Sequence, residues 1–320
     1  MKNQDSILLF GASGQIGKSL IRKFTKNNYK VIAVTRSIHR KGYKIKTQSN
    51  YGYLEVVELN NFNEENILPL IEKCSICINL IGILFEKEKN DFKIIHSKFP
   101  SLLSKLCKKK KLKQFIHVSA LGIENATDSL YALSKLEGES EVKKNFNNTL
   151  VLKPSVVYSV DDNFTTYLMT LLSRMPIMPL YYNGNTKFTP IHVTDFAEII
   201  FEVVKRKIVG ETIECIGPEV LTFKDIVLII LKSIKKKRLL ISTPLIFAKL
   251  IAKILQIMPK PLLTTDQLKL LKYDNVASGK FKTNFDFNID SKKKFHNEIE
   301  TYSFNWSSGG QFSKKNYIKN

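Results

Sequence analysis

Cysteine and long apolar runs are scarce in this chain, and each scarcity excludes a class of protein. Four cysteines in 320 residues are too few for a disulfide framework, so we expect a protein of a reducing compartment. No segment with charged, apolar and small-residue parts precedes the first apolar run, so we expect a cytoplasmic rather than a secreted chain. No apolar run is long and continuous enough to make a convincing transmembrane helix.

Arginine is also rare, although the chain is strongly basic. The formal net charge is +21, yet only six of the 50 basic residues are arginine, and the rest are lysines scattered among asparagine and isoleucine. Nucleic-acid sites favour arginine and lysine clustered on one face with aromatic side chains between them. We therefore expect no nucleic-acid partner. A basic surface of this kind still attracts anionic lipid or acidic proteins.

The first half of the chain alternates strand patterns with helix patterns. Short apolar runs typical of buried parallel strands are separated by segments with helical periodicity. The expected strands are 6–10, 30–35, 53–59, 75–81, 114–119 and 149–153, and the expected helices are 14–26, 62–73, 89–110 and 130–146. This alternation predicts an α/β fold with a Rossmann-type doubly wound parallel sheet and right-handed crossovers.

The alternation breaks after Pro154, where longer apolar and helical segments follow. Thr194 is the expected cap of a helix that starts at Asp195, and residues 222–225 have the pattern of a capping box. We expect a Rossmann domain over 1–155 and a smaller, mainly helical C-terminal lobe over 156–290 for docking or substrate. Residues 291–320 are polar with scattered aromatic side chains, and they predict an extended tail that orders against a partner or the body of the protein.

The segment 243–258 (TPLIFAKLIAKILQIM) is apolar around most of a helix, with Lys249 and Lys253 four residues apart on one side. One interpretation is a core helix of the smaller lobe. The other is a helix that docks on a partner or lies on a membrane surface.

Three glycines spaced three apart follow the first expected strand. Gly11 permits a tight turn out of that strand, Gly14 lets the backbone approach a pyrophosphate, and Gly17 lets the next helix pack close to the sheet. The helix N-terminus would favour the negative charge of the pyrophosphate. Because the glycines follow a strand and open a helix, we expect a dinucleotide site.

The end of the second expected strand indicates which nucleotide binds there. Sites for NAD place an acid at this point, whereas this chain reads VTRSIHR over 34–40, without a carboxylate. Arg36 can pair with a 2′-phosphate through its planar guanidinium group, so NADPH is favoured over NADH. The alternative is a solvated basic loop, which is the favoured interpretation for Arg40.

Tyr131 and Lys135 stand four residues apart on the expected helix after the fifth strand. This spacing places the phenol and the ammonium group on one helical face, where the lysine can lower the tyrosine pKa and hold the nicotinamide ribose. Of the 12 tyrosines, only Tyr131 has a lysine four residues on. Ser119, at the end of the fifth strand, is the candidate hydroxyl for orienting a substrate.

Together these residues resemble the short-chain dehydrogenase/reductase superfamily in its extended, atypical form. Later segments resemble the family of alpha-subcomplex subunit nine of respiratory complex I, NADH:ubiquinone oxidoreductase. These segments are HVSALG (117–122), KPSVVY (153–158), FTPIHVTDFA (188–197), GPEVLTF (217–223), LLTTDQ (262–267), KYDNV (272–276) and GGQF (309–312). The resemblance covers nearly the whole chain and is thinnest over about 278–300.

The resemblance implies tight NADPH binding without known turnover, at the junction of the two arms of complex I, with relatives linked to ubiquinone biosynthesis. Extended reductases commonly carry a second hydroxyl two residues beyond the Ser119 position, where this chain has Leu121. Tyr131 and Lys135 would then remain as ribose clamps. The residues assigned to the cofactor are Gly11, Ser13, Gly14, Gln15, Ile16, Gly17, Arg36, Asn60, Leu80, Gly82, Tyr131, Lys135 and Pro154.

Two functions follow from these patterns. The first is an NADPH-binding accessory or assembly subunit of complex I or of membrane quinone metabolism, with a structural cofactor, at the cytoplasmic face of the inner membrane. The second is an active NADP-dependent reductase or nucleotide-sugar epimerase, with Tyr131 as general acid/base and Lys135 tuning it. We expect no metal site, because Cys74 and Cys77 have no second pair and the five histidines form no ligand cluster in the sequence.

Overall fold

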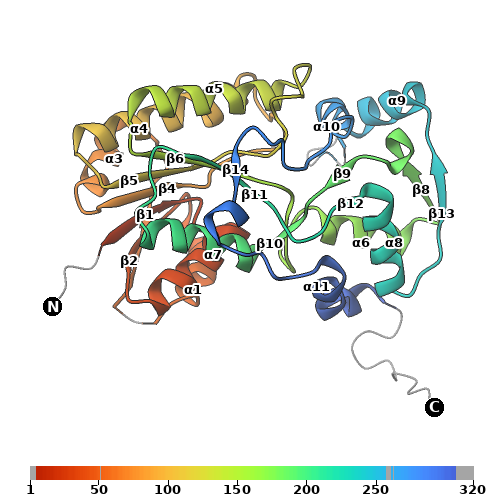
Figure 1. The fold of residues 1–320 in the computed structure, drawn as a ribbon, viewed down its shortest axis with the longest axis horizontal. Coiled ribbons are helices and arrows are strands. Elements are labelled where there is room, and N and C mark those ends of the chain that lie inside the picture. The colour runs from red at the N-terminus through yellow and green to blue at the C-terminus, as the bar shows by residue number, and fades with distance from the viewer. Residues whose placement is uncertain (1–4, 51, 257–260, 262, 308–320) are drawn as a thin grey trace, which may run out of the picture.

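The computed structural model describes residues 5–50, 52–256, 261 and 263–307 (Figure 1). Residue 262 and the segment 309–312, which contribute to the family resemblance, lie outside the described residues. An eight-stranded parallel sheet runs in the order β14-β11-β6-β5-β4-β1-β2-β3. Its strands are β1 (Ser6–Phe10), β2 (Lys30–Thr35), β3 (Leu54–Glu58), β4 (Ile76–Asn79), β5 (Gln114–Val118), β6 (Thr149–Pro154), β11 (Thr212–Cys215) and β14 (Lys282–Thr283).

Helices cover both faces of this sheet, which confirms the predicted doubly wound fold (Figure 1). One face carries α1 (Gln15–Lys26), α2 (Ile38–Lys46) and α7 (Val193–Lys205), whose apolar residues pack against the strands. The other face carries α3 (Glu64–Ile71), α4 (Phe99–Lys109) and α5 (Leu130–Asn145). A π-helical segment, η1 (Lys93–Lys98), runs directly into α4.

A second apolar core lies in the part of the chain beyond the sheet. It is formed mainly by α6 (Thr165–Arg174), α8 (Phe223–Ser233) and α11 (Phe295–Tyr302). Short strand pairs link the segments in this part of the chain. They are β7 (Val157–Tyr158) with β10 (Ile191–His192), β8 (Ile177–Leu180) with β13 (Leu239–Ser242), and β9 (Lys187–Phe188) with β12 (Leu221–Thr222). The remaining elements are α9 (Leu245–Leu255), α10 (Thr265–Leu270) and the short helices η2 (Tyr181–Gly184), η3 (Phe285–Phe287) and η4 (Ser303–Trp306).

Three sequence-based expectations need correction. The helix expected from Asp195 begins at Val193, because the His192 side chain rather than Thr194 accepts the capping hydrogen bond, from the Thr194 N–H. The tail is not extended over residues 295–306, where α11 and η4 form, but it does order against the body of the protein, with Phe295 buried in the second core. The capping box of Thr222 and Asp225 is confirmed at the start of α8.

The third correction concerns the apolar helix α9, which is not a core helix. Ala248 and Ala252 are buried against the lobe, but Ile246 is 81% exposed and Phe247 is 59% exposed. Leu250 is exposed as well. The core interpretation is therefore wrong, and α9 presents an apolar face to its surroundings.

Candidate nucleotide site

The loop between β1 and α1 forms the turn that the glycine spacing predicts. Gly11 has a φ of +82°, and the Gly14 N–H donates to the Gly11 carbonyl at 3.0 Å. A Cβ on Gly17 would lie 2.5 Å from that carbonyl oxygen, so glycine is needed for α1 to pack this closely. No side chain caps the first turn of α1, and no acidic residue lies in it. The backbone N–H groups there suit a pyrophosphate.

Three other predicted residues, one in this loop and two at the start of α1, have different surroundings. Ser13 is half-buried, and Ile16 packs against the core on the α1 face of the sheet. The Gln15 amide nitrogen donates to the Val157 carbonyl at 3.1 Å, and its amide oxygen accepts from the Ser159 hydroxyl at 2.6 Å. The Gln15 side chain therefore joins the loop to the segment that leads into the lobe.

At the end of β2, the structure brings together Arg36, Asn60 and an acid that sequence reading did not include. The Arg36 side chain is exposed directly after β2. Glu58, the last residue of β3, accepts a hydrogen bond from the Ile38 N–H at 2.6 Å and one from the Asn60 amide nitrogen at 3.3 Å. These hydrogen bonds lower the pKa of Glu58, with the Ile38 contribution the larger.

Tyr131 and Lys135 lie in the first half of α5. A residue of the lobe binds the start of this helix. Asp266 of α10 accepts hydrogen bonds from the Leu130 N–H at 2.9 Å and the Tyr131 N–H at 3.0 Å. The Lys135 ammonium group is buried and donates to the Val118 carbonyl at 3.2 Å, at the end of β5. The lobe thus fixes the helix that carries the predicted pair.

The structure does not support the prediction that Lys135 lowers the pKa of Tyr131. Burial raises the pKa of Tyr131 to about 12, and Lys135 is not among the causes of that shift. Burial likewise lowers the pKa of Lys135 to about 8, although Glu139 opposes this shift. Desolvation disfavours the charged form of each side chain. The expectation of a lowered tyrosine pKa is therefore wrong for this arrangement.

The carboxyl ends of three neighbouring strands bring the other predicted residues to the same edge of the sheet. Leu80 follows β4, Ser119 follows β5 and Pro154 ends β6. The Pro154 carbonyl accepts from the Leu121 N–H at 3.0 Å, and the Leu121 side chain is buried. A Cβ on Gly82 would lie 3.2 Å from the Lys135 Nζ, so glycine leaves room for this ammonium group.

His96 is a residue of this site that sequence reasoning missed. It is buried in η1, and its Nε2 accepts a hydrogen bond from the Ile83 N–H at 3.0 Å. Burial and the nearby Lys135 lower the pKa of His96 to about 3, so the ring is neutral and its proton is on Nδ1. Nδ1 donates to the Ser134 hydroxyl at 2.9 Å, which donates to the Tyr131 carbonyl at 2.8 Å.

A π-helical turn is often found at functional sites, and here it places His96 between the Gly82 loop and α5. A Cβ on Gly138 would overlap the His96 carbonyl oxygen, so α5 packs directly on this turn. The His96 and Tyr131 rings meet edge to face, with centroids 5.4 Å apart. A lone histidine in a helical pattern carries no distinguishing feature in the sequence, so the sequence alone does not place His96 in this site.

Two buried polar atoms near Lys135 have no protein partner among the described residues. These are the Ser119 hydroxyl oxygen and the His117 Nε2. His117 Nδ1 accepts from the Asn79 amide at 3.3 Å, so the unpartnered Nε2 carries the proton. Buried polar atoms are normally satisfied, and an uncapped helix N-terminus lies at the other end of the same sheet edge. These features fit a dinucleotide that lies across the strand ends.

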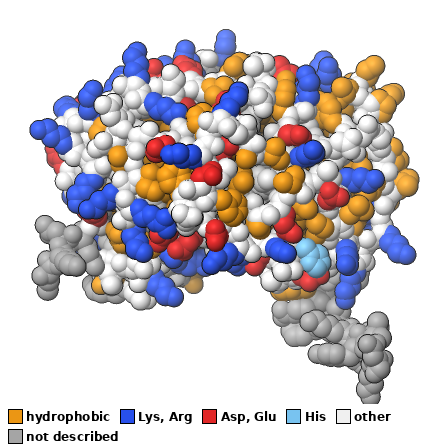
Figure 2. All heavy atoms as spheres, in the orientation of Figure 1, with side chains coloured by type: hydrophobic (Ala, Val, Ile, Leu, Met, Phe, Trp, Pro, Cys, Tyr) orange, Lys and Arg blue, Asp and Glu red, His pale blue; other side chains and the backbone are white. Residues whose placement is uncertain are grey.

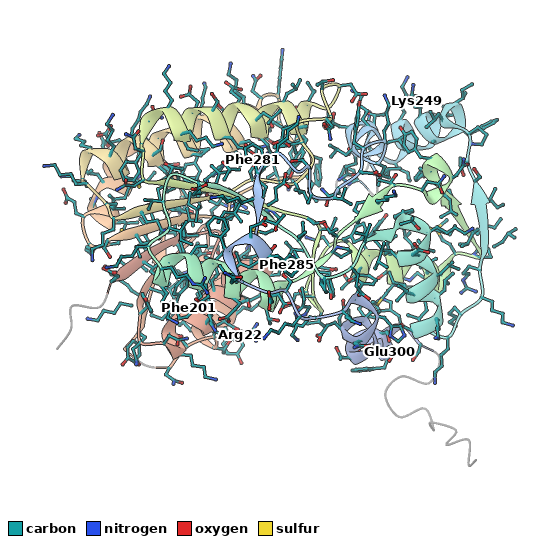
Figure 3. The ribbon with its side chains drawn as sticks, in the orientation of Figure 1. Arg22, Phe201, Lys249, Phe281, Phe285 and Glu300 are labelled. Carbon is teal, nitrogen blue, oxygen red and sulfur yellow. The ribbon has the colours of Figure 1, made fainter. Side chains whose placement is uncertain are left out.

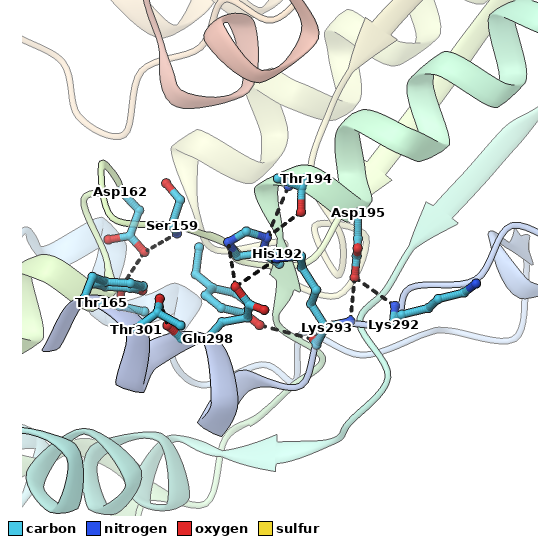
Figure 4. Close-up of polar contacts among 12 residues, drawn as sticks. Ser159, Asp162, Thr165, His192, Thr194, Asp195, Lys292, Lys293, Glu298 and Thr301 are labelled. Atoms are coloured by element: carbon cyan, nitrogen blue, oxygen red, sulfur yellow. Dashed lines mark hydrogen bonds and ion pairs between the residues drawn. The ribbon is translucent and has the colours of Figure 1, made fainter. Parts of the chain in front are cut away.

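A second polar cluster closes the lobe against the sheet (Figure 4). Asp195 of α7 accepts hydrogen bonds from the Lys292 N–H at 2.9 Å and the Lys293 N–H at 2.8 Å. The Lys293 ammonium group pairs with Glu298 at 3.0 Å. Lys18 of α1 also pairs with Asp161 of the lobe segment. The Lys18–Asp161 pair joins α1 to the lobe, and the Asp195 contacts join α7 to the segment that leads into α11.

Within the described ranges, no group of three or more His, Cys, Asp or Glu side chains is placed to hold a metal ion. Cys77 is buried in β4 beside Cys107 of α4, within the apolar core. Among the same residues, none of the helices is long and apolar enough to cross a membrane.

Comparison with known proteins identifies relatives of two kinds. The chain is 23% identical to the mitochondrial NADH-ubiquinone oxidoreductase 40 kDa subunit of Neurospora crassa, over 88% of this chain and 74% of that protein. It is 24% identical to the NADH dehydrogenase [ubiquinone] 1 alpha subcomplex subunit 9 of Arabidopsis thaliana, over 84% of this chain and 70% of that protein. A ceramide reductase of Caulobacter vibrioides is 21% identical over 64% of this chain and 62% of its own length.

Solved structures of NAD-dependent sugar-nucleotide enzymes share the fold. A UDP-glucuronic acid 4-epimerase from Bacillus cereus, in complex with UDP-glucuronic acid and NAD, has a TM-score of 0.70 at 18% identity, covering 93% of this chain and 98% of its own. A dTDP-glucose 4,6-dehydratase from Bacillus anthracis, in complex with NAD, has a TM-score of 0.70 at 17% identity, covering 94% and 96%. The model of the NAD dependent epimerase/dehydratase family matches residues 7–215, which include the glycine loop, Tyr131 and Lys135. The chain therefore belongs to the NAD dependent epimerase/dehydratase family.

Proposed function

We propose that this chain holds NADPH as a structural cofactor and serves as an accessory or assembly subunit associated with respiratory complex I. Its relatives in Neurospora and Arabidopsis carry the names of complex I subunits, which supports this association. A partner in membrane quinone metabolism is the alternative within the same proposal. The proposed place of action is the cytoplasmic face of the inner membrane.

The observation that carries this proposal is the contrast between the two ends of the site. The uncapped start of α1 and the close packing that Gly17 permits support a place for a pyrophosphate at the glycine loop. At the other end, the phenol of Tyr131 has a pKa of about 12, far from the value that a general acid/base needs near neutral pH. Leu121 stands where extended reductases commonly carry a second hydroxyl, which supports retention of the nucleotide without turnover.

Different residues would hold different parts of the nucleotide. The loop from Gly11 to Gly17 would face the pyrophosphate, Arg36 the 2′-phosphate and Asn60 the adenine side. Tyr131 and Lys135 would hold the nicotinamide ribose by hydrogen bonds. A bound nicotinamide nucleotide supplies a hydride in reductases; here the contribution of these side chains is to bind and orient.

The helix α9 is the proposed contact with a partner subunit or an anionic lipid surface. Ile246, Phe247 and Leu250 are exposed on a helix whose Lys249 and Lys253 are exposed as well. Lys249 points away from the body of the protein (Figure 3). In Figure 2, apolar side chains gather at the end of the molecule where α9 and β13 lie, and lysine and arginine side chains lie beside them and over the rest of that face. Apolar side chains next to lysines suit a membrane surface.

The second candidate function is an active NADP-dependent reductase or nucleotide-sugar epimerase. The observation that favours it is the Ser119 hydroxyl, which is buried beside the Tyr131 and Lys135 helix and has no protein partner among the described residues. A substrate hydroxyl or carbonyl could use this group. In that case Tyr131 would exchange a proton with the substrate, and Lys135 would stabilise the charged phenolate.

Replacing Tyr131 by phenylalanine separates the two functions. If the cofactor is structural, the Tyr131→Phe protein binds NADPH within about threefold of the wild-type affinity, because one hydrogen bond is lost from many. It also co-purifies with the same respiratory subunits from membranes. The measurements are calorimetric titration and a native pull-down with both proteins.

The enzyme alternative gives a different result with the same protein. For a reductase, it predicts that the wild-type protein oxidises NADPH with a carbonyl substrate; for an epimerase, it predicts interconversion of a nucleotide sugar with no net change in the bound nucleotide. In both cases Tyr131→Phe abolishes turnover while leaving binding intact. A wild-type pull-down without respiratory subunits, together with rapid turnover, would contradict the structural-cofactor proposal.

A further inference from the structure

The first turn of α5 carries Tyr131, and two side chains accept hydrogen bonds from the backbone of this turn. The Ser129 hydroxyl is the N-cap and accepts from the Ala132 N–H at 3.3 Å. The Asp266 carboxylate accepts from the Leu130 N–H at 2.9 Å and the Tyr131 N–H at 3.0 Å. The N–H groups of a first turn have no partner inside their own helix. A residue 135 positions after Tyr131 therefore completes the cap of α5.

The chain around Asp266 contacts the residues that lead into α5 at further points (Figure 1). The Lys269 ammonium group donates to the Asp128 carbonyl at 2.7 Å, and the Tyr273 hydroxyl donates to the Asp128 carboxylate at 3.0 Å. Tyr273 and Tyr131 both pack against the same small apolar cluster. Several contacts thus bind the lobe to the start of α5, and those of Asp266 reach Tyr131 directly.

The backbone of Tyr131 is held on both sides. Its N–H donates to Asp266, and its carbonyl accepts from the Ser134 hydroxyl at 2.8 Å. Lys135 has an anchor of its own, since its ammonium group donates to the Val118 carbonyl at 3.2 Å. Loss of the Asp266 carboxylate would leave two N–H groups of the first turn without their acceptor, and such a loss loosens a helix start. It would therefore displace Tyr131 more than Lys135.

We propose that Asp266 is a positioning residue of the nucleotide site, which holds the first turn of α5 so that Tyr131 reaches the nicotinamide ribose. The inference rests on the proposed nucleotide-binding function. It gives the lobe a direct part in the affinity for the nicotinamide end, because α10 lies outside the sheet and packs with α9. The glycine loop and Arg36, which would hold the other end, make no hydrogen bond with Asp266 among the described residues.

The test is a calorimetric titration of wild-type and Asp266→Ala proteins with NADPH and with 2′,5′-ADP, which carries the 2′-phosphate but no nicotinamide ribose. We expect NADPH to bind about tenfold more weakly to Asp266→Ala, and 2′,5′-ADP to bind within about twofold of the wild type. The loss for NADPH exceeds that of Tyr131→Phe because the nucleotide must also order the loosened turn on binding. A general loss of folded protein would weaken both ligands equally, so the split separates positioning from stability.

Asp225→Ala is the matched control. Asp225 is also a capping aspartate of the lobe, and its carboxylate accepts from the Thr222 N–H at 3.0 Å at the start of α8. Its loss should leave the affinity for both ligands unchanged. If Asp266→Ala does not fold, Asp266→Asn takes its place. Asparagine keeps the size but has only one acceptor oxygen, so we expect a several-fold loss for NADPH alone.

The proposed function and this inference fail in different ways. If the wild-type chain binds neither ligand, the proposed function fails, and this inference fails with it. If the wild type binds NADPH but the Asp266 variant binds both ligands as Asp225→Ala does, only the inference is overturned. An equal loss of affinity for both ligands overturns it as well.

Discussion

The pKa values of the titratable residues in this site depend more on burial than on neighbouring charges. Spacing in the sequence placed Tyr131 and Lys135 correctly on one helix, since a four-residue interval returns to the same helical face. It could not give their pKa values, because these depend on how much water the folded chain removes. The sequence also could not identify His96 as part of the site, because its place there depends on three contacts with residues from other parts of the fold.

The buried Lys135 predicts a pH dependence of stability. Between pH 8 and 10.5 the unfolded chain holds the lysine proton and the folded chain does not, so stability rises with pH in this window. Relative to Lys135→Met, the wild type should therefore gain about 3 kcal/mol of unfolding free energy from pH 7.5 to 10.5. Urea denaturation at several pH values measures this gain.

The control for this comparison is Lys144→Met, an exposed lysine on the same helix. Its unfolding free energy should follow that of the wild type at every pH. A Lys135→Met protein whose stability also follows the wild type throughout this range would show that Lys135 is not desolvated in the folded chain.

Among the elements, those with strong local patterns were predicted and the short ones were not. The strands β1 to β6 are rich in apolar and β-branched residues, and their expected ranges agree with the structure within about two residues. Strands β11 and β14 join the same sheet from beyond residue 155, but they have four and two residues and depend on pairing with β6 and with each other. Helix α2 was missed because its pattern is mostly polar.

Two glycines at the start of α1 should affect stability differently when they are replaced by alanine. In Gly17→Ala the new Cβ would meet the Gly11 carbonyl at 2.5 Å, so α1 must shift, at a cost of about 2 to 3 kcal/mol in unfolding free energy. In Gly14→Ala the Cβ would lie 3.4 Å from the same oxygen, which is an ordinary contact. Its stability should stay within about 0.5 kcal/mol of the wild type.

Nucleotide affinity should respond differently from stability in these variants. Gly14→Ala places a methyl group where the backbone approaches the pyrophosphate, so we expect NADPH to bind about tenfold more weakly to a normally stable protein. Urea denaturation and calorimetric titration measure the two quantities. Equal losses of stability in the two variants would contradict the separate roles assigned to these glycines.

At the scale of the whole molecule, side-chain contacts join the lobe to the helices that start at the carboxyl ends of the sheet strands. Gln15 and Lys18 of α1 contact the segment 157–161, and Asp266 of α10 holds the start of α5. These contacts join residues more than 100 positions apart, so no local pattern in the sequence could predict them. The glycine spacing predicted the nucleotide site and the family resemblance predicted the relatives, whereas the exposed face of α9 could be recognised only once the fold was known.

The central claim is that the chain binds NADPH and retains it without consuming it. The most direct measurement is a calorimetric titration of the purified, nucleotide-free wild-type protein with NADPH, followed by spectroscopic assay of the nucleotide recovered from the complex. The account predicts saturable binding of one NADPH per chain, with the nucleotide recovered in its reduced form after long incubation. No binding, or steady oxidation of NADPH with a small soluble carbonyl compound, would contradict it.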